Sequence, residues 1–206
     1  MRTSSGALCV TAVLAITLLA GSASADAALE EHFSGGFPPN GWAVWDYAGD
    51  GVVWQRNSVW GDDNWTGGTG YCAEVSSSHS PGLDYATTLE SPAFVVPPDA
   101  LLFFRANYQN FMGNDRFEVS ILFGINHITI VDWTSDQGSF EDLPGIGCVT
   151  PLPPMVFGQE IKLEFRYRND VTSPDDDYYI QIDDVIVGDE SAVHGISWGA
   201  IKALYR

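Results

Sequence analysis

The chain has 206 residues, and its 27 acidic against 9 basic side chains give a formal net charge of −18. Such an acidic protein is repelled by nucleic acid and by anionic membrane surfaces, so we expect neither a nucleic-acid partner nor membrane insertion. The length is typical of a single domain that is large enough to bury a core.

The first residues have the pattern of an export signal. Arg2 precedes an apolar run over residues 7–20, and small residues up to Ala25 follow it, which is typical of a signal peptide cleaved at that point. We therefore expect a signal peptide over residues 1–25 and a domain over residues 26–190. The protein is then secreted and extracellular, either free or associated with the cell surface.

The remainder of the chain reads as strands separated by Gly, Pro and Ser turns. The predicted strands, in chain order, are 71–77, 85–90, 93–96, 101–108, 117–123, 161–168 and 178–188. Within the longer ones, apolar residues recur with a period of two, and Pro144–Gly158 is expected to be a loop. Many short alternating strands predict an all-β protein with a two-sheet sandwich. Four arginines are expected on one outer sheet face, where pairing with acids is the simpler explanation: Arg105, Arg116, Arg166 and Arg168.

The last predicted strand contains two adjacent acids, Asp183 and Asp184. Because side chains alternate across a strand, one of the two is expected to point to each face. A carboxylate that faces the core must be paired, protonated or bound to a metal. The alternative is an edge strand whose two acids are both solvated.

Two cysteines follow the predicted signal peptide, Cys72 and Cys148. In an oxidising compartment they could form one disulfide, and two unpaired thiols are the alternative. Residues 191–206 are expected to be a tail, either a short helix or a sorting tag, that is dispensable for folding.

The tryptophans fall into two groups. Trp42, Trp45 and Trp54 are expected to fill the sandwich core. Trp60 and Trp65 lie in or beside loops rich in Gly and Asp, where an exposed ring could stack on a sugar or anchor a protein partner. We therefore treat Trp60 and Trp65 as candidate ligand-binding residues, with local packing as the alternative.

The sequence offers little for catalysis. Residues 195–199 match G-x-S-x-G, but the nine residues after Ser197 include no acid and no histidine, so a hydrolase triad in that order is excluded. No H-E-x-x-H zinc pattern occurs. Paired carboxylates for glycoside hydrolysis stay open, but no local motif indicates a pair.

One resemblance joins these features. The F-P-P-x-G-W segment at Phe37–Trp42, the Asp/Gly loop that leads to Trp54, the Leu89–Pro92 motif and the closing Ile182–Val185 resemble, in that order, the choice-of-anchor J or cleaved-adhesin type domain. This type occurs in gingipain adhesin regions and is akin to MAM-like and carbohydrate-binding jelly rolls. The resemblance implies a jelly-roll sandwich, bound calcium and an accessory binding role. It also implies calcium ligands at the first and last strands, together with the aromatic loop: Glu31, Asp46, Asp50, Asp183 and Asp184.

The sequence thus predicts a secreted, non-catalytic, calcium-stabilised module that binds a glycan or a protein surface. A secreted carbohydrate-active hydrolase on a lectin-like sandwich and a structural surface or matrix subunit are the alternatives. Facing carboxylates in a groove would favour the hydrolase, and exposed aromatic rings over a shallow face would favour the binder.

Overall fold

The fold is known from a computed structural model. It describes residues 27–77, 85–110, 113, 115–169, 179–189 and 192–193. The predicted signal peptide and most of the predicted tail lie outside these residues.

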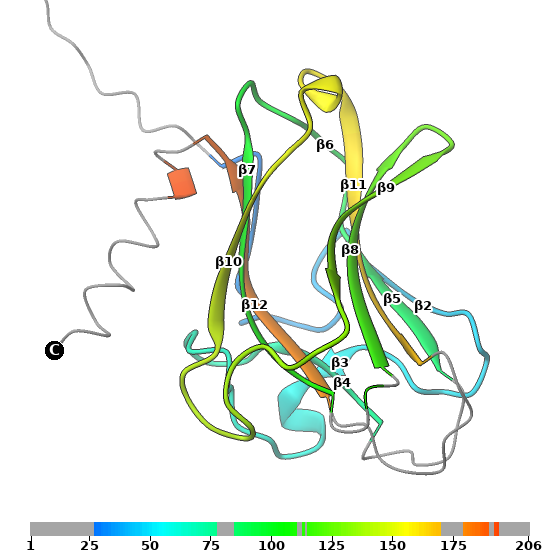
Figure 1. The fold of residues 1–206 in the computed structure, drawn as a ribbon, viewed down its shortest axis with the longest axis vertical. Coiled ribbons are helices and arrows are strands. Elements are labelled where there is room, and N and C mark those ends of the chain that lie inside the picture. The colour runs from blue at the N-terminus through cyan, green and yellow to red at the C-terminus, as the bar shows by residue number, and fades with distance from the viewer. Residues whose placement is uncertain are drawn as a thin grey trace, which may run out of the picture.

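The described residues contain twelve strands, which form two antiparallel sheets that face each other as a sandwich (Figure 1). In sheet A the order is β10 (Ile146–Pro151), β7 (Leu101–Gln109), β12 (Tyr179–Gly188), β4 (Ala73–Ser76) and β3 (Gln55–Arg56), and β1 (Leu29–Glu31) pairs with β12. In sheet B the order is β2 (Ala43–Asp46), β5 (Ala86–Glu90), β11 (Glu160–Asn169), β8 (Asp115–Phe123) and β9 (Asn126–Trp133), and β6 (Phe94–Val95) pairs with β11. Two 3-10 turns, η1 (Asn57–Val59) and η2 (Pro154–Val156), complete the described elements. The predicted all-β sandwich is confirmed.

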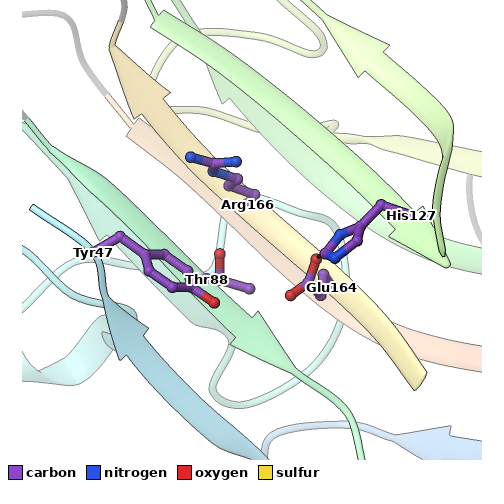
Figure 2. Close-up of a pocket in the computed structure, with 5 residues that line it drawn as sticks. All are labelled: Tyr47, Thr88, His127, Glu164 and Arg166. Atoms are coloured by element: carbon purple, nitrogen blue, oxygen red, sulfur yellow. Dashed lines mark ion pairs between the residues drawn. The ribbon is translucent and has the colours of Figure 1, made fainter. Parts of the chain in front are cut away.

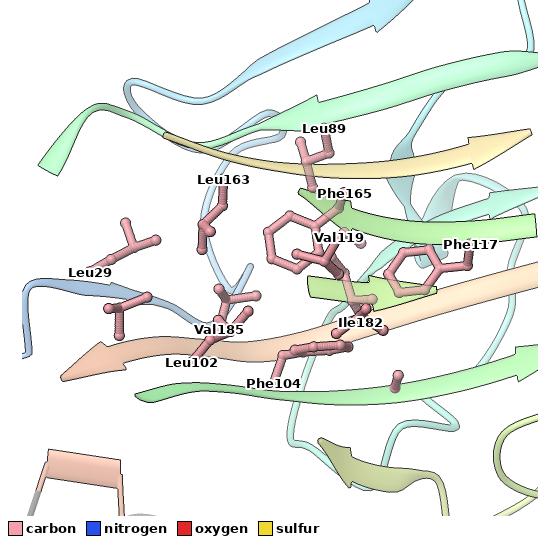
Figure 3. Close-up of a cluster of buried hydrophobic side chains, with 14 of the residues drawn as sticks. Leu29, Leu89, Leu102, Phe104, Phe117, Val119, Leu163, Phe165, Ile182 and Val185 are labelled. Carbon is pink, nitrogen blue, oxygen red and sulfur yellow. The ribbon is translucent and has the colours of Figure 1, made fainter. Parts of the chain in front are cut away.

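The core between the sheets is built from the alternating residues of the long strands (Figure 3). On β11 the inward set is Ile161, Leu163, Phe165 and Tyr167, each at most 2% exposed, and on β7 it is Leu102, Phe104, Ala106 and Tyr108, each fully buried. The predicted faces of these two strands are therefore confirmed. The inward apolar surface is the main favourable contribution to folding, because burial removes it from water.

Two of the longer strands were not predicted, nor were the short strands β2 and β3. β10 lies inside Pro144–Gly158, which was expected to be a loop, and β9 follows a two-residue turn after β8. β10 alternates between exposed and half-buried residues with two glycines and a proline nearby, so its local sequence resembles a loop. Its pairing with β7 decides its conformation.

The outer face of sheet A is covered by two loops. Residues 60–72 and 134–145 contact β7 and β12 through hydrogen bonds from two buried amides. Gln181 accepts from Trp65 N and donates to Asp63 O, and Asn107 Nδ2 donates to the carbonyls of Ser139 and Asp142. Sheet A is thus buried on both faces where these loops lie.

The predicted Cys72–Cys148 disulfide is wrong for this structure, in which both thiols are free. Cys148 lies on β10 and Cys72 immediately precedes β4, and β7 and β12 separate these strands in sheet A. Three strand spacings amount to about 14 Å, whereas a disulfide requires Cα atoms within about 7 Å.

After β12 the chain turns back onto the outer face of sheet A. The Val193 amide donates to the Asp189 carbonyl, and the Val193 side chain, 1% exposed, packs on Phe103 and Ile186. Val193 therefore contacts sheet A, and the expectation that the chain after about Ser191 is dispensable for folding stays a prediction. In the described part of the chain, no helix has the length and apolar character needed to span a membrane.

Candidate functional site

The outer face of sheet B differs from that of sheet A because polar side chains on it surround an open pocket. Residues that pair across antiparallel strands share a face. One such row crosses the whole sheet through Trp45, Thr88, Arg166, Glu118 and Asp132. A parallel row contains Glu90, Glu164 and Ser120. Both rows point away from the core.

Within this face lies a pocket of about 340 Å³ that is lined by Tyr47, Thr88, His127, Glu164 and Arg166 (Figure 2). The lining comes from three strands of sheet B, β5, β11 and β9, and from the residue after β2, so the pocket runs across the sheet. Thr88 and Glu164 form its buried base, while 60% of Tyr47 is exposed. A concave site with an exposed ring and a few converging polar groups is typical of small-ligand binding.

Most charges on this face are paired. Lys162 Nζ lies 2.6 Å from Glu90 Oε1, and Arg168 Nε lies 2.9 Å from Glu118 Oε2. His127 Nδ1 lies 3.2 Å from Glu164 Oε2. Burial raises the pKa of Glu164, and the charge of neighbouring Glu90 adds to this rise, whereas His127 and Arg166 oppose it.

Two polar atoms of the pocket lack a hydrogen-bond partner among the residues that the structure describes. They are Thr88 Oγ1 and Arg166 Nε, and both are almost fully buried. The Arg166 guanidinium lies 5.9 Å from the centroid of the Tyr47 ring. Buried polar groups are normally satisfied, so an unsatisfied pair in an open pocket indicates a place where a ligand could supply the missing partners.

Trp45 corrects the expectation that three tryptophans fill the core. Trp42 and Trp54 are buried, but Trp45 is 47% exposed on β2. Trp42 and Trp45 are three positions apart in an extended segment, and an odd separation places two side chains on opposite faces. Trp45 and Tyr47 are therefore the exposed aromatic residues at the β2 edge of this face.

The basic residues are also distributed differently from the prediction. Arg116, Arg166 and Arg168 share the outer face of sheet B with Lys162, but Arg105 lies on β7 in sheet A. Its Nε lies 2.8 Å from Asp184 Oδ2. Three of the four predicted arginines, Arg105, Arg116 and Arg168, pair with acids, as the simpler explanation predicted. Arg166 forms no ion pair with the described residues of this face.

Of the predicted calcium ligands, Asp183 and Asp184 have different environments. Asp183 is 1% exposed, and it is covered by the 60–72 loop rather than by the core. Among the described residues, its carboxylate accepts from Asn64 Nδ2 and Asp184 N, and burial raises its pKa to about 7. Asp184 instead lies between Arg105 and His32, which are cationic partners for a carboxylate.

A β-bulge between Asp183 and Ile186 on β12, with Asp184 at φ 49°, explains why the two acids have different environments. Without the bulge, alternation would direct Asp184 into the sandwich. A left-handed residue at this position redirects its side chain toward Arg105 on the outer face. The expectation of one acid facing the core is therefore wrong, because neither carboxylate points inward.

The other predicted metal ligands do not join Asp183. Glu31 pairs with Val185, whose side chain is in the core, so Glu31 lies on the opposite face of sheet A from Asp183, and its Oε1 accepts from Phe33 N. Asp46 is the last residue of β2 in sheet B and accepts from Gly51 N and Gly49 N, which lowers its pKa. Asp50 Oδ1 accepts from Val52 N. Over the described residues, no three His, Cys, Asp or Glu side chains are grouped so as to hold a metal ion.

The two predicted ligand-binding tryptophans lie away from the pocket, in the segment that joins η1 to β4 in sheet A. Trp65 stacks on Tyr179 at 4.8 Å between ring centroids, and both Trp60 and Trp65 are half-buried. The pocket residues were not predicted. Their one sequence signal is that they lie at outward positions of strongly alternating strands, which many solvated residues also do.

Comparison with known proteins finds the same fold in solved structures of other chains. No protein-family model matches the chain, and no curated protein matches it. Two cleaved adhesin domains of Lys-gingipain from Porphyromonas gingivalis superpose with TM-scores of 0.56 and 0.53, at 19% and 18% identity. They cover 79% and 80% of this chain and 98% and 99% of their own. The carbohydrate-binding module TmCBM61, solved in complex with β-1,4-galactotriose, superposes with a TM-score of 0.52 at 13% identity, covering 80% of this chain and 99% of its own. At these identities the likeness shows the fold.

Proposed function

We propose that this protein is a non-catalytic binding module that binds a carbohydrate in the pocket on the outer face of sheet B. The observation that carries the proposal is the exposed ring of Tyr47 beside two atoms that lack a described hydrogen-bond partner, Thr88 Oγ1 and Arg166 Nε. A sugar presents an apolar ring face for stacking and hydroxyls that donate and accept hydrogen bonds. Both kinds of contact are present in this pocket.

Support also comes from the fold. A module with the same fold binds β-1,4-galactotriose, and cleaved adhesin domains share it. Membership of the choice-of-anchor J type is part of the proposal because the order of the sequence motifs supports it. Secretion, with or without attachment to a cell surface, is part of it because residues 1–25 have the pattern of a signal peptide. A protein surface is the second kind of ligand for such a module.

The test is a glycan-array screen with the purified chain, followed by calorimetric titration of the best ligand. We expect Tyr47→Ala and Trp45→Ala to weaken binding about fivefold to tenfold through loss of aromatic contact. Tyr71→Ala is the matched control, because Tyr71 is also exposed but lies beside β4 in sheet A. Trp60→Ala in the same series tests the ligand-binding role predicted from the sequence. Equal losses for Tyr47→Ala and Tyr71→Ala would refute the sheet B site.

One observation favours a hydrolase: Glu90 on β5 and Glu164 on β11 occupy directly opposite positions of neighbouring strands. Glycoside hydrolysis requires two carboxyl groups on either side of the scissile bond. Only Glu164 lines the pocket, and Glu90 is held by Lys162 at 2.6 Å. We therefore place binding above catalysis. New reducing ends after prolonged incubation with the bound glycan, abolished by Glu164→Gln, would reverse this order.

Calcium stabilisation stays a prediction, and it now rests on Asp183. The predicted ligands Glu31 and Asp184 have other partners, whereas Asp183 keeps a buried carboxylate with neutral donors alone. If a cation neutralises Asp183, calcium will raise the melting temperature and a chelator will lower it, and Asp183→Asn will remove that response. Identical melting curves with calcium and with chelator would end the prediction.

A further inference from the structure

Arg166 differs from the other cations on the outer face of sheet B. Lys162, Arg116 and Arg168 each lie within ion-pair distance of a carboxylate, at 2.6, 2.6 and 2.9 Å. Arg166 shares the pocket with Glu164 but forms no such pair in the described part of the chain, and Glu164 pairs with His127 instead. Among the described residues the guanidinium therefore forms no close ion pair, although its charge acts on neighbouring Glu164.

The surroundings of Arg166 are those of a binding group rather than of a solvated surface arginine. Its Nε is buried without a hydrogen-bond partner, and so is the Thr88 hydroxyl opposite it on β5. Its guanidinium is held near the exposed ring of Tyr47. Figure 2 shows Arg166 and Glu164 projecting from β11 on the same side as Tyr47 and Thr88.

The nearby acids do not prevent an anion from binding. Glu90 is neutralised by Lys162, and the Glu164 carboxyl lies 3.2 Å from His127 Nδ1. Burial also raises the pKa of Glu164, which favours its uncharged form. The remaining negative charge of the protein acts over longer distances, and salt screens charges beyond about 8 Å at physiological ionic strength.

We infer that the sheet B pocket selects a sugar that carries a carboxylate, a uronic acid unit of an acidic polysaccharide, and that Arg166 binds the carboxylate. A guanidinium matches a carboxylate in shape and can donate two parallel hydrogen bonds to it. The sugar ring then lies against Tyr47, and a ring or carboxylate oxygen accepts from the Thr88 hydroxyl. This inference rests on the proposed function, because it names the class of glycan for that pocket.

The experiment compares three short ligands by calorimetric titration of the purified chain. They are an oligogalacturonide, its fully methyl-esterified form and a neutral galacto-oligosaccharide of the same length. Esterification removes the charge and keeps the ring. We expect the acid to bind about tenfold or more tightly than the ester, the range expected for a charged hydrogen bond. Added sodium chloride is expected to weaken binding of the acid and to leave binding of the ester unchanged.

The variants assign this difference to one residue. Arg166→Gln is expected to bind acid and ester equally, because glutamine keeps donors and lacks charge. Arg116→Gln is the matched control on the same face, since Arg116 is paired with Asp132, and it is expected to keep the preference. Melting curves of both variants establish that they are folded.

The outcomes separate the inference from the function beneath it. Three results would overturn the inference and leave the glycan site standing. The wild-type chain could bind acid and ester equally, it could bind a sulfated galacto-oligosaccharide more tightly than the acid, or Arg166→Gln could keep the wild-type preference. Failure of all these ligands and of a broad glycan array overturns the proposed function itself.

Discussion

Both sheets carry polar side chains at the outward positions of their strands, but those on sheet A are buried and those on sheet B keep contact with solvent. On sheet A, the polar residues Glu74, Asn107, Gln181 and Asp183 are at most 1% exposed. Loop backbone covers them and accepts or donates their hydrogen bonds. On sheet B, Arg116, Glu118 and Arg166 keep contact with solvent and Tyr47 is largely exposed.

This difference shows how one sandwich divides stability and binding between its faces. A buried polar group must be satisfied or it destabilises the fold, so the sheet A network fixes its loops in one arrangement. An exposed polar group is free to exchange water for a ligand. The buried face is therefore expected to respond to mutation by losing stability, and the open face by losing affinity.

The largest effect is expected from Gln181→Leu. Gln181 is fully buried and its amide contacts Trp65 N, Asp63 O and Glu74 Oε2. Leucine would leave these groups without partners, at a cost of about 3 kcal/mol in the free energy of unfolding. Urea denaturation measures this loss in the free energy of unfolding.

Thr88→Val on sheet B is the matched control. It removes a hydroxyl that has no hydrogen-bond partner among the described residues, so stability should hold while glycan affinity falls. Equal destabilisation by the two variants would contradict the division between the faces.

A second test targets the 134–145 loop through Gly145. A Cβ at Gly145 would lie 2.5 Å from Ala106 O and 2.6 Å from Thr66 O, which are backbone atoms of sheet A and of the other covering loop. Gly145→Ala should therefore destabilise the protein by about 2 kcal/mol through overpacking. Gly36→Ala is the control, since no atom lies within 4 Å of its Cβ. A thermal melt of Gly145→Ala that matches the wild type would show that this loop is not tightly packed on sheet A.

The buried acids of sheet A should make stability depend on pH. Burial raises the pKa of Asp183 from 3.8 to about 7, and burial together with Asp62 raises that of Glu74 from 4.5 to about 9. Because the folded state holds these protons more tightly than the unfolded chain, their contribution is complete below about pH 4 and is lost as pH rises through both values. We expect the melting temperature to fall from pH 5 to pH 9.

The variants Asp183→Asn and Glu74→Gln should each flatten part of that decline, Asp183→Asn around neutral pH and Glu74→Gln at higher pH. Glu160→Gln serves as the control, because Glu160 is exposed at the start of β11. A melting temperature that stays level or rises over this range would show that these carboxyl groups are ionised in the folded protein.

The smallest effect is expected at Val193. Its side chain packs on Phe103 and Ile186 outside the main core. Val193→Ala should lower the free energy of unfolding by about 1 kcal/mol, without any change in glycan binding on sheet B. A loss too small to measure by urea denaturation would support the expectation that the chain beyond the last strand is dispensable.

The amino-acid sequence by itself determined the fold class and the core face of the long strands. Alternation on β7 and β11 predicted which residues are inward, because successive side chains on a strand point to opposite sides whatever else the chain does. The same local rule could have placed Trp45 opposite Trp42. The acids of the closing strand were correctly recognised as unusual, but their surroundings were not predicted.

Tertiary structure alone decided which outward face is covered. The Asn64 amide that contacts Asp183 is 119 positions away in the chain, and the Asp63 carbonyl that accepts from Gln181 is 118 positions away. A period of two contains no information about such distant contacts. The bulge at Asp184 and the two strands between the cysteines likewise depend on pairing with β7. The binding pocket arises in the same way, since Tyr47, Thr88, His127, Glu164 and Arg166 become neighbours only when β2, β5, β11, β8 and β9 pair side by side.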